Sequence, residues 1–193
     1  MNTASKYHAT NQQMDAEFKL IEAAKLDINR FGPLYDKYYK QIFNYLYQRL
    51  DDKETAFDVT SQVFLKAMTN LSKYQFKGVP FSSWLYRIAY SELMQLFREK
   101  KAQRTVNADV SDLKHLCEEI KENYYDDFLP VLSKVLAELD ELELQLVEMR
   151  FFEKRPFKEV AEVLELSETN AKVKLHRLLE KIKKSLKNNN SIK

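Results

Sequence analysis

The scarcity of glycine and proline limits the folds open to this chain more than any other feature of its sequence. Two glycines and four prolines in 193 residues amount to about 3%, against about 12% in an average protein. β-Sandwiches, barrels and dinucleotide-binding folds need many more glycines in their turns. With Gly32 and Gly78 alone, neither a G-x-G-x-x-G motif nor a Walker phosphate loop can occur. Hydrophobic residues make up 45% of the chain, which is enough to form a packed core. With so few glycines and prolines, we expect an all-α protein.

Apolar residues at helical spacing fall into two groups along the chain. They predict helices over 15–29, 33–50, 54–72 and 81–101, and then over 130–139, 141–153, 157–164 and 168–187. Between the groups the apolar period is lost and acidic residues accumulate. We therefore expect two small helical domains joined by a flexible acidic linker. Whether that linker contains a helical turn around Leu113–Tyr124 is left open. The expected boundaries are 1–29 for an N-terminal extension with the first helix, 30–104 and 128–187 for the domains, 105–127 for the linker and 188–193 for a tail.

Charge is unevenly distributed, although the formal net charge is only +2. Residues 172–187 hold seven basic side chains against one acid, and residues 98–104 hold four against one. Between them, residues 109–127 hold seven acids against two lysines. Two basic segments separated by an acidic one favour two anion-binding modules and a connector.

The C-terminal segment has the pattern of a helix-turn-helix. A short predicted helix over 157–164 is followed by a three-residue turn and a long basic helix, and Ser167 is a good N-cap for that helix. Ala171, Leu175, Leu178, Leu179, Ile182 and Leu186 should form its core side. The opposite face carries groups that can read base edges and hold phosphates: Thr169, Asn170, Val173, His176, Arg177 and Lys184. The alternative is an ordinary solvated lysine-rich face.

Two helices of the N-terminal group have unusual outer faces. The helix over 54–72 exposes Asp58, Gln62 and Leu65, which could form a small protein-docking face, although one exposed leucine is also normal. The helix over 81–101 has an expected inner stripe of Leu85, Ile88, Ala89 and Leu96. Its outer side mixes aromatic rings with cations, a combination that suits single-stranded nucleic acid: Trp84, Arg87, Tyr90, Ser91, Met94, Arg98 and Lys101. The alternative is that Trp84 and Tyr90 belong to the core, which is evenly balanced for Trp84 and less favoured for Tyr90.

Three stretches together resemble the sigma-70 family of RNA polymerase sigma factors. Residues 58–67 (DVTSQVFLKA) and 81–89 (FSSWLYRIA) are similar to its regions 2.2 to 2.4, and residues 160–177 (VAEVLELSETNAKVKLHR) to its region 4.2. The small size, with only these two modules, resembles the extracytoplasmic-function (ECF, group 4) type. The resemblance implies a factor that binds core RNA polymerase and directs promoter-specific transcription initiation. It leaves open whether an anti-sigma factor also binds.

The resemblance also implies a role for each face. Asp58, Gln62 and Leu65 would dock on the clamp helices of the largest polymerase subunit. The Trp84 helix, with the loop 74–81, would read and hold the melted −10 strand of the promoter. The last helix would read the −35 duplex, with these residues at the family's contact positions: Lys172, Val173, Lys174, His176 and Arg177.

The chain departs from the family pattern at four places. Ser61-Gln62 stands where the family usually has Gln-Glu, and Tyr90-Ser91 where it has Arg-Asn. Glu165 replaces the common turn glycine, which implies backbone strain if the turn requires a positive φ. Glu92 replaces an apolar residue and should weaken packing unless it finds a cation.

Other functional classes explain less of the sequence. A helix-turn-helix regulator that acts without polymerase would explain 156–187 but not the aromatic and basic helix. A carboxylate-bridged di-metal enzyme needs two Glu-x-x-His pairs, but the histidines are only His8, His115 and His176. We therefore expect no enzyme activity, cofactor or metal. A single cysteine, Cys117, a polar N-terminus and no long apolar run favour the cytoplasm, with no membrane insertion.

Overall fold

The computed structural model describes residues 11–99, 110–120 and 128–190, and over these ranges it consists of helices without any strand. The chain divides into two compact units, Met1–Thr105 and Val106–Lys193. The expected all-α fold with two helical domains is confirmed. No helix within the described ranges is long and apolar enough to cross a membrane.

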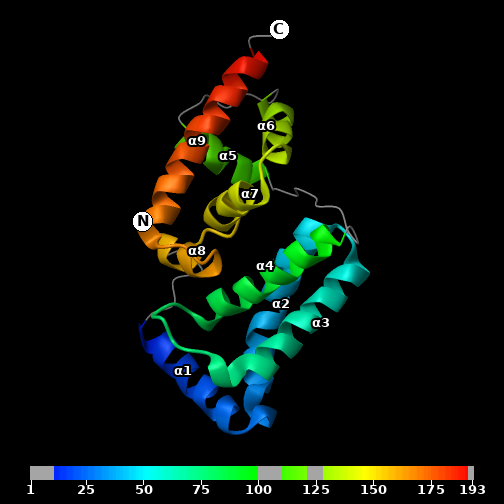
Figure 1. Ribbon diagram of the computed structural model, residues 1–193, viewed down its shortest axis with the longest axis vertical. Coiled ribbons are helices and arrows are strands. Elements are labelled where there is room, and N and C mark those ends of the chain that lie inside the picture. Colours follow the sequence, from blue (N-terminus) through cyan, green and yellow to red (C-terminus); the bar gives the residue numbers. More distant parts are fainter. Residues whose placement is uncertain (1–10, 100–109, 121–127, 191–193) are drawn as a thin grey trace. The chain divides into compact units, whose positions relative to one another are not determined.

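Over residues 11–99, the first unit is a bundle of four helices (Figure 1). They are α1 (Asn11–Leu26), α2 (Gly32–Leu50), α3 (Lys53–Asn70) and α4 (Phe81–Arg98), with 3-10 turns at Ile28–Phe31 and Leu71–Lys73. α2, α3 and α4 pack against one another. Their core is rich in aromatic and aliphatic side chains, among which Leu34, Ile42, Tyr45, Leu46, Phe81, Leu85 and Tyr86 are almost wholly buried.

Local chemistry explains where these helices begin. Pro33 occupies the first turn of α2, where its missing N–H costs nothing. The Asp52 side chain accepts a hydrogen bond of 2.8 Å from the backbone N–H of Thr55 and so caps α3. Hydrogen bonds from the Thr55 side chain and backbone lower the pKa of Asp52. The cap therefore keeps its charge to a lower pH than an ordinary aspartate does.

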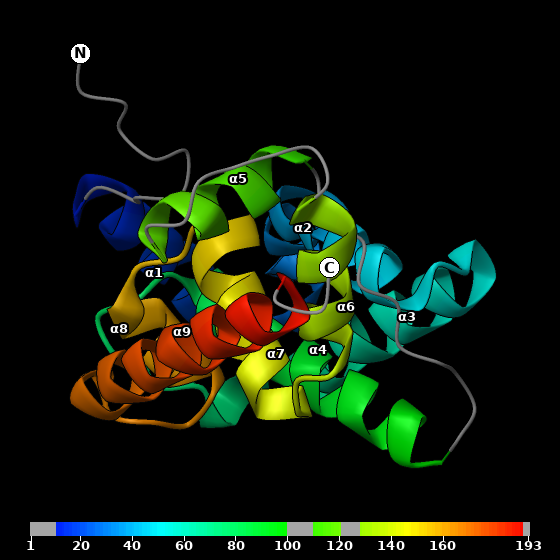
Figure 2. The ribbon, with the colours of Figure 1, turned by 90° about the horizontal axis from the view of Figure 1, so that it is seen from above.

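The second unit is built around one long helix. Its elements are α5 (Val110–Glu119), α6 (Phe128–Ala137), α7 (Glu141–Val147), α8 (Phe157–Val163) and α9 (Glu168–Asn190). α7 continues into a π-helical turn, Glu148–Phe152. α6, α7 and α8 all pack against α9, which Figure 2 shows in orange to red. Asp140 and Glu143 form a reciprocal capping box that starts α7.

Part of the expected linker is helical in the structure. α5 lies inside 105–127 and packs against α6 and the π-helical turn. Leu113, Leu116, Cys117 and Ile120 are all at most 5% exposed. Their spacing of three and four residues is helical. The sequence left open a helical turn in this segment but assigned the segment to the linker, because acidic residues interrupt its apolar period. The remaining residues of the expected linker, 105–109 and 121–127, lie outside the described ranges.

The buried face of α4 also differs from the expected stripe. Leu85 and Ala89 are buried as expected, but Ile88 and Leu96 are only half-buried. Tyr86 and Leu93 are buried instead, at 0% and 1% exposure. The reason is that α4 packs against both α2 and α3, so its buried arc is wider than a single stripe.

Candidate nucleic-acid interface

The turn between α8 and α9 has the geometry of a helix-turn-helix. The backbone N–H of Leu166 donates to the Ala161 carbonyl at 2.9 Å, which closes the C-terminus of α8. Glu165 has a φ of 55°, so the turn does require the left-handed region and the expected strain at this non-glycine residue is present. The Ser167 hydroxyl accepts a hydrogen bond of 3.1 Å from the backbone N–H of Asn170, which confirms Ser167 as the cap of α9.

A buried ion pair holds α8 in place. Arg155 Nη1 lies 2.7 Å from Glu159 Oε2, and the two side chains are only 3% and 5% exposed. Arg150 Nη1 donates to the Arg155 carbonyl at 3.1 Å, and this hydrogen bond joins the segment just before α8 to the π-helical turn. α8, the first helix of the helix-turn-helix, is therefore held by this ion pair as well as by the burial of Val160 and Val163.

α9 separates an apolar inner side from a polar outer face. The expected inner residues Ala171, Leu175, Leu178, Ile182 and Leu186 are at most 4% exposed, while Leu179 is half-buried. The outer face is exposed at Thr169, Asn170, Lys172, Val173, His176, Arg177 and Lys184. Lys174 is half-buried at the edge of this face. Lys172 Nζ lies 2.6 Å from Glu168 Oε1 and 5.7 Å from the Phe157 ring centre, contacts that place its charge above the start of α8.

The outer face of α4 is partly packed. Trp84 is half-buried, with its ring centre 5.1 Å from that of Tyr74 and 5.3 Å from that of Phe81. Arg87, Tyr90 and Met94 are also half-buried, whereas Ser91 and Arg98 are exposed. Trp84 and Tyr90 are thus neither core residues nor fully exposed. Lys101, the last expected member of this face, lies outside the described residues.

α3 exposes its expected docking residues. Asp58, Gln62 and Leu65 all face solvent, and Leu65 is 58% exposed. Ser61, at the first departure from the family pattern, donates its hydroxyl hydrogen bond to the Phe57 carbonyl of its own helix at 3.0 Å. Glu92 does find a cation, since Lys66 Nζ lies 2.6 Å from its Oε1 and joins α4 to α3.

Sequence reasoning missed a buried carboxylate and an exposed ring near α4. Glu17 on α1 is 4% exposed, and Phe76 in the segment between α3 and α4 is 44% exposed. The available signal was the position of Glu17, which lies four residues before Ile21 on the buried stripe of α1.

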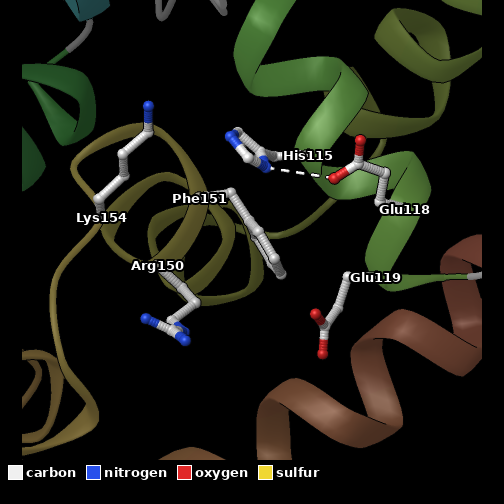
Figure 3. Close-up of a pocket in the computed structure, with 6 residues that line it drawn as sticks. All are labelled: His115, Glu118, Glu119, Arg150, Phe151 and Lys154. Atoms are coloured by element: carbon white, nitrogen blue, oxygen red, sulfur yellow. Dashed lines mark ion pairs between the residues drawn. The ribbon is translucent and has the colours of Figure 1, made fainter. Parts of the chain in front are cut away.

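A hollow between α5 and the π-helical turn is lined by charged side chains that do not converge on one point (Figure 3). Its volume is about 310 Å³, and it is lined by His115, Glu118, Glu119, Arg150, Phe151 and Lys154. His115 Nδ1 lies 3.4 Å from Glu118 Oε2, whereas Arg150 and Lys154 point in opposite directions.

Burial, and then the charge of Glu118, raise the pKa of the Cys117 thiol, so that thiol is a poor nucleophile. Among the residues that the structure describes, no three His, Cys, Asp or Glu side chains gather to hold a metal ion.

Comparison with known proteins finds matches in both units. Residues 34–103 match the family model "Sigma-70 region 2", and residues 135–184 match "Sigma-70, region 4". The chain is 28% identical to the ECF RNA polymerase sigma factor BldN of Streptomyces coelicolor, covering 76% of this chain and 56% of BldN. It is 28% identical to the RNA polymerase sigma factor YlaC of Bacillus subtilis (79% and 90% covered) and 24% identical to the ECF RNA polymerase sigma factor SigW of that organism (91% and 98%).

The fold has a counterpart among solved structures. The structure of CnrH in complex with the cytosolic domain of CnrY aligns with a TM-score of 0.59 at 19% identity, covering 90% of this chain and 98% of that one. This likeness concerns the fold.

Proposed function

The chain belongs to the sigma-70 family, as an ECF RNA polymerase sigma factor, and from this premise we propose which of its surfaces direct promoter-specific transcription. The outer face of α9 reads the −35 duplex, and α4 with residues 74–81 holds the melted −10 strand. The outer face of α3 docks on the clamp helices of the largest polymerase subunit. The observation that carries the proposal is the exposure of α9's reading groups on a helix whose opposite side is buried.

The composition of the α9 face suits duplex DNA. Thr169 and Asn170 supply a hydroxyl and an amide near the helix N-terminus, the part of a recognition helix that contacts base edges. Val173, 43% exposed, can contact a thymine methyl. Arg177 and Lys172 supply cations for phosphates or a guanine edge.

The composition of the α4 face suits an unpaired strand. Three of its seven residues, Trp84, Tyr90 and Met94, are aromatic or thioether side chains that are half-buried, and its cations Arg87 and Arg98 lie on the same side. Bases stack on such rings while cations hold the phosphates. Because Trp84 is wedged against Tyr74 and Phe81, its exposed side offers a rigid platform.

The first test separates the two DNA-reading helices. Arg177→Ala should weaken binding to linear duplex promoter DNA by about 1–3 kcal/mol, the range for a specific arginine contact. Tyr90→Ala should leave duplex binding intact but reduce strand opening, since stacking is worth about 1–3 kcal/mol per base. Filter binding measures the first effect, and permanganate reactivity of −10 thymines measures the second.

Pre-melted −10 DNA provides the control for this test. It should partly rescue Tyr90→Ala and should not rescue Arg177→Ala. The proposed division of roles is wrong if Tyr90→Ala opens promoters normally, or if pre-melted DNA rescues both variants equally.

The second test concerns docking. Asp58→Ala with Leu65→Ala should weaken core-polymerase binding about tenfold, as the loss of contacts near the centre of an interface does. Both side chains are exposed, so the free energy of unfolding should change by under about 0.5 kcal/mol. Co-purification with polymerase measures binding, and Lys53→Ala, exposed at the start of the same helix, is the matched control. Undiminished co-purification would remove the docking role.

A helix-turn-helix regulator that acts alone is not favoured, because both sigma regions are matched. Such a regulator would footprint its operator without polymerase. A sigma factor needs core enzyme to open DNA, so run-off transcription with and without core enzyme discriminates the two. Sigma factors are transcription initiation factors rather than enzymes, and the proposal assigns this chain no catalytic residue.

A protein ligand that sequesters the chain is a further element of the proposal. CnrH is bound to the cytosolic domain of CnrY in its solved structure. An anti-sigma factor for this chain would compete with core polymerase. Adding core enzyme to the purified complex should then displace it.

A further inference from the structure

Glu17 is a buried carboxylate that joins three parts of the first unit. Its Oε1 accepts hydrogen bonds from Lys37 Nζ at 2.7 Å and from the Tyr38 hydroxyl, both on α2. Its Oε2 accepts a hydrogen bond of 2.7 Å from the backbone N–H of Phe81, the first residue of α4. Pro80, the residue before α4, offers no side-chain cap, so Glu17 supplies that acceptor from a distant helix.

Two other residues of α1 contact the segment that precedes α4. The ring centres of Phe18 and Phe76 are 5.8 Å apart, and Lys25 Nζ lies 5.7 Å from the ring centre of Tyr74. α1 also packs against the 3-10 turn Leu71–Lys73. α1 thus touches the connection between α3 and α4 at its beginning and its middle and binds the first residue of α4, and Figure 1 shows α1 beside this connection.

The packing of α1 in the core does not by itself require these contacts. Ile21 and Ala24 already anchor α1, at 1% exposure each. Phe18 and Phe76 are 40% and 44% exposed, so their contact lies at the surface. α1 also lies before residue 34, where the match to the sigma-70 region 2 model begins.

We propose that α1 is a positioning element that holds residues 74–81 ready for the melted −10 strand, with Glu17 fixing the start of α4 and Phe18 fixing Phe76. The proposal rests on the −10 role given above to this segment and α4. A segment that is already ordered loses less conformational entropy when it binds DNA. Removing its supports should therefore reduce strand opening without affecting −35 binding.

The experiment uses the full-length chain with core polymerase on a promoter fragment that the holoenzyme transcribes in run-off assays. The variants are Phe18→Ala, Phe76→Ala, their combination, and Glu17→Gln, which keeps the volume but loses an acceptor. Leu20→Ala is the matched control, because Leu20 lies on α1 and is 37% exposed. Permanganate reactivity of −10 thymines reports opening, filter binding reports duplex affinity, and Trp84 fluorescence during unfolding reports the fold.

The expected result for Phe18→Ala is a loss of opening of about twofold to tenfold, the range that an aromatic pair supplies. In the Phe76→Ala background the same substitution should cause no further loss, because Phe18 acts through Phe76. Glu17→Gln should reduce opening, and Leu20→Ala should not. Duplex binding should be unchanged in all five variants.

Three results would overturn the proposal: normal opening by Phe18→Ala and Glu17→Gln, additive losses in the double variant, or an equal loss in Leu20→Ala. Tyr90→Ala keeps the two proposals apart. If Tyr90→Ala impairs opening while the α1 variants do not, only the role of α1 is wrong. If Tyr90→Ala and Phe76→Ala both open promoters normally, the −10 role itself fails.

Discussion

Glu159→Ala should lower the free energy of unfolding of the second unit by about 3–5 kcal/mol, the cost of breaking a buried ion pair. The substitution leaves the Arg155 guanidinium, which is 3% exposed, without the carboxylate 2.7 Å away. Because α8 carries Glu159, the entry to the helix-turn-helix should loosen first. Promoter binding should fall with it, since α9 packs against α8.

The single tryptophan makes this loss measurable in the full-length chain. Trp84 lies in the first unit, so its fluorescence follows that unit, whereas far-ultraviolet circular dichroism follows the helices of both. In urea, Glu159→Ala should show an early loss of circular dichroism with an unchanged Trp84 transition. Glu138→Ala, exposed in the same unit, is the matched control and should change neither.

The double variant Arg155→Met with Glu159→Leu identifies the cause. Replacing a buried pair with apolar side chains is commonly neutral or stabilising. The double variant should therefore recover most of the lost stability. If it is as unstable as Glu159→Ala, the pair is not the source of the loss.

Leu116→Ala should destabilise the second unit by about 2–5 kcal/mol, the cost of a large-to-small change in a packed core. Leu116 is 0% exposed on α5, a helix within the segment that the sequence suggested to be a linker. The same urea titration measures the change. Lys114→Ala, on the exposed side of α5, is the control and should stay within about 0.5 kcal/mol.

This substitution decides between the two interpretations of α5. A connector makes no core contacts, so an unchanged unfolding curve for Leu116→Ala would support the linker. An early circular dichroism transition, with Trp84 unaffected, would show that α5 belongs to the fold of the second unit.

The helical class, the two units and the faces of α3 and α9 could be predicted from the sequence. Each depends on local periodicity. Asp58, Gln62 and Leu65 recur at three and four residues, as do Thr169, Val173 and His176, so one helix suffices to bring each set together. The turn before α9 was equally local, because Ser167 accepts its capping hydrogen bond from Asn170, three residues further along the chain.

Tertiary contacts decided the features that involve several elements. The sequence left open a helical turn at α5 but assigned the segment to the linker, because its leucines become core only where the π-helical turn and α6 cover them. The half-burial of Trp84 depends on Tyr74, ten residues earlier. Glu17 accepts a hydrogen bond from Phe81, 64 residues away, and no local pattern encodes such a partner. The sequence alone thus determined the helices and their polar faces, because side-chain periodicity is local. Which polar group is buried, and against what, was decided by packing between segments that are distant in the chain.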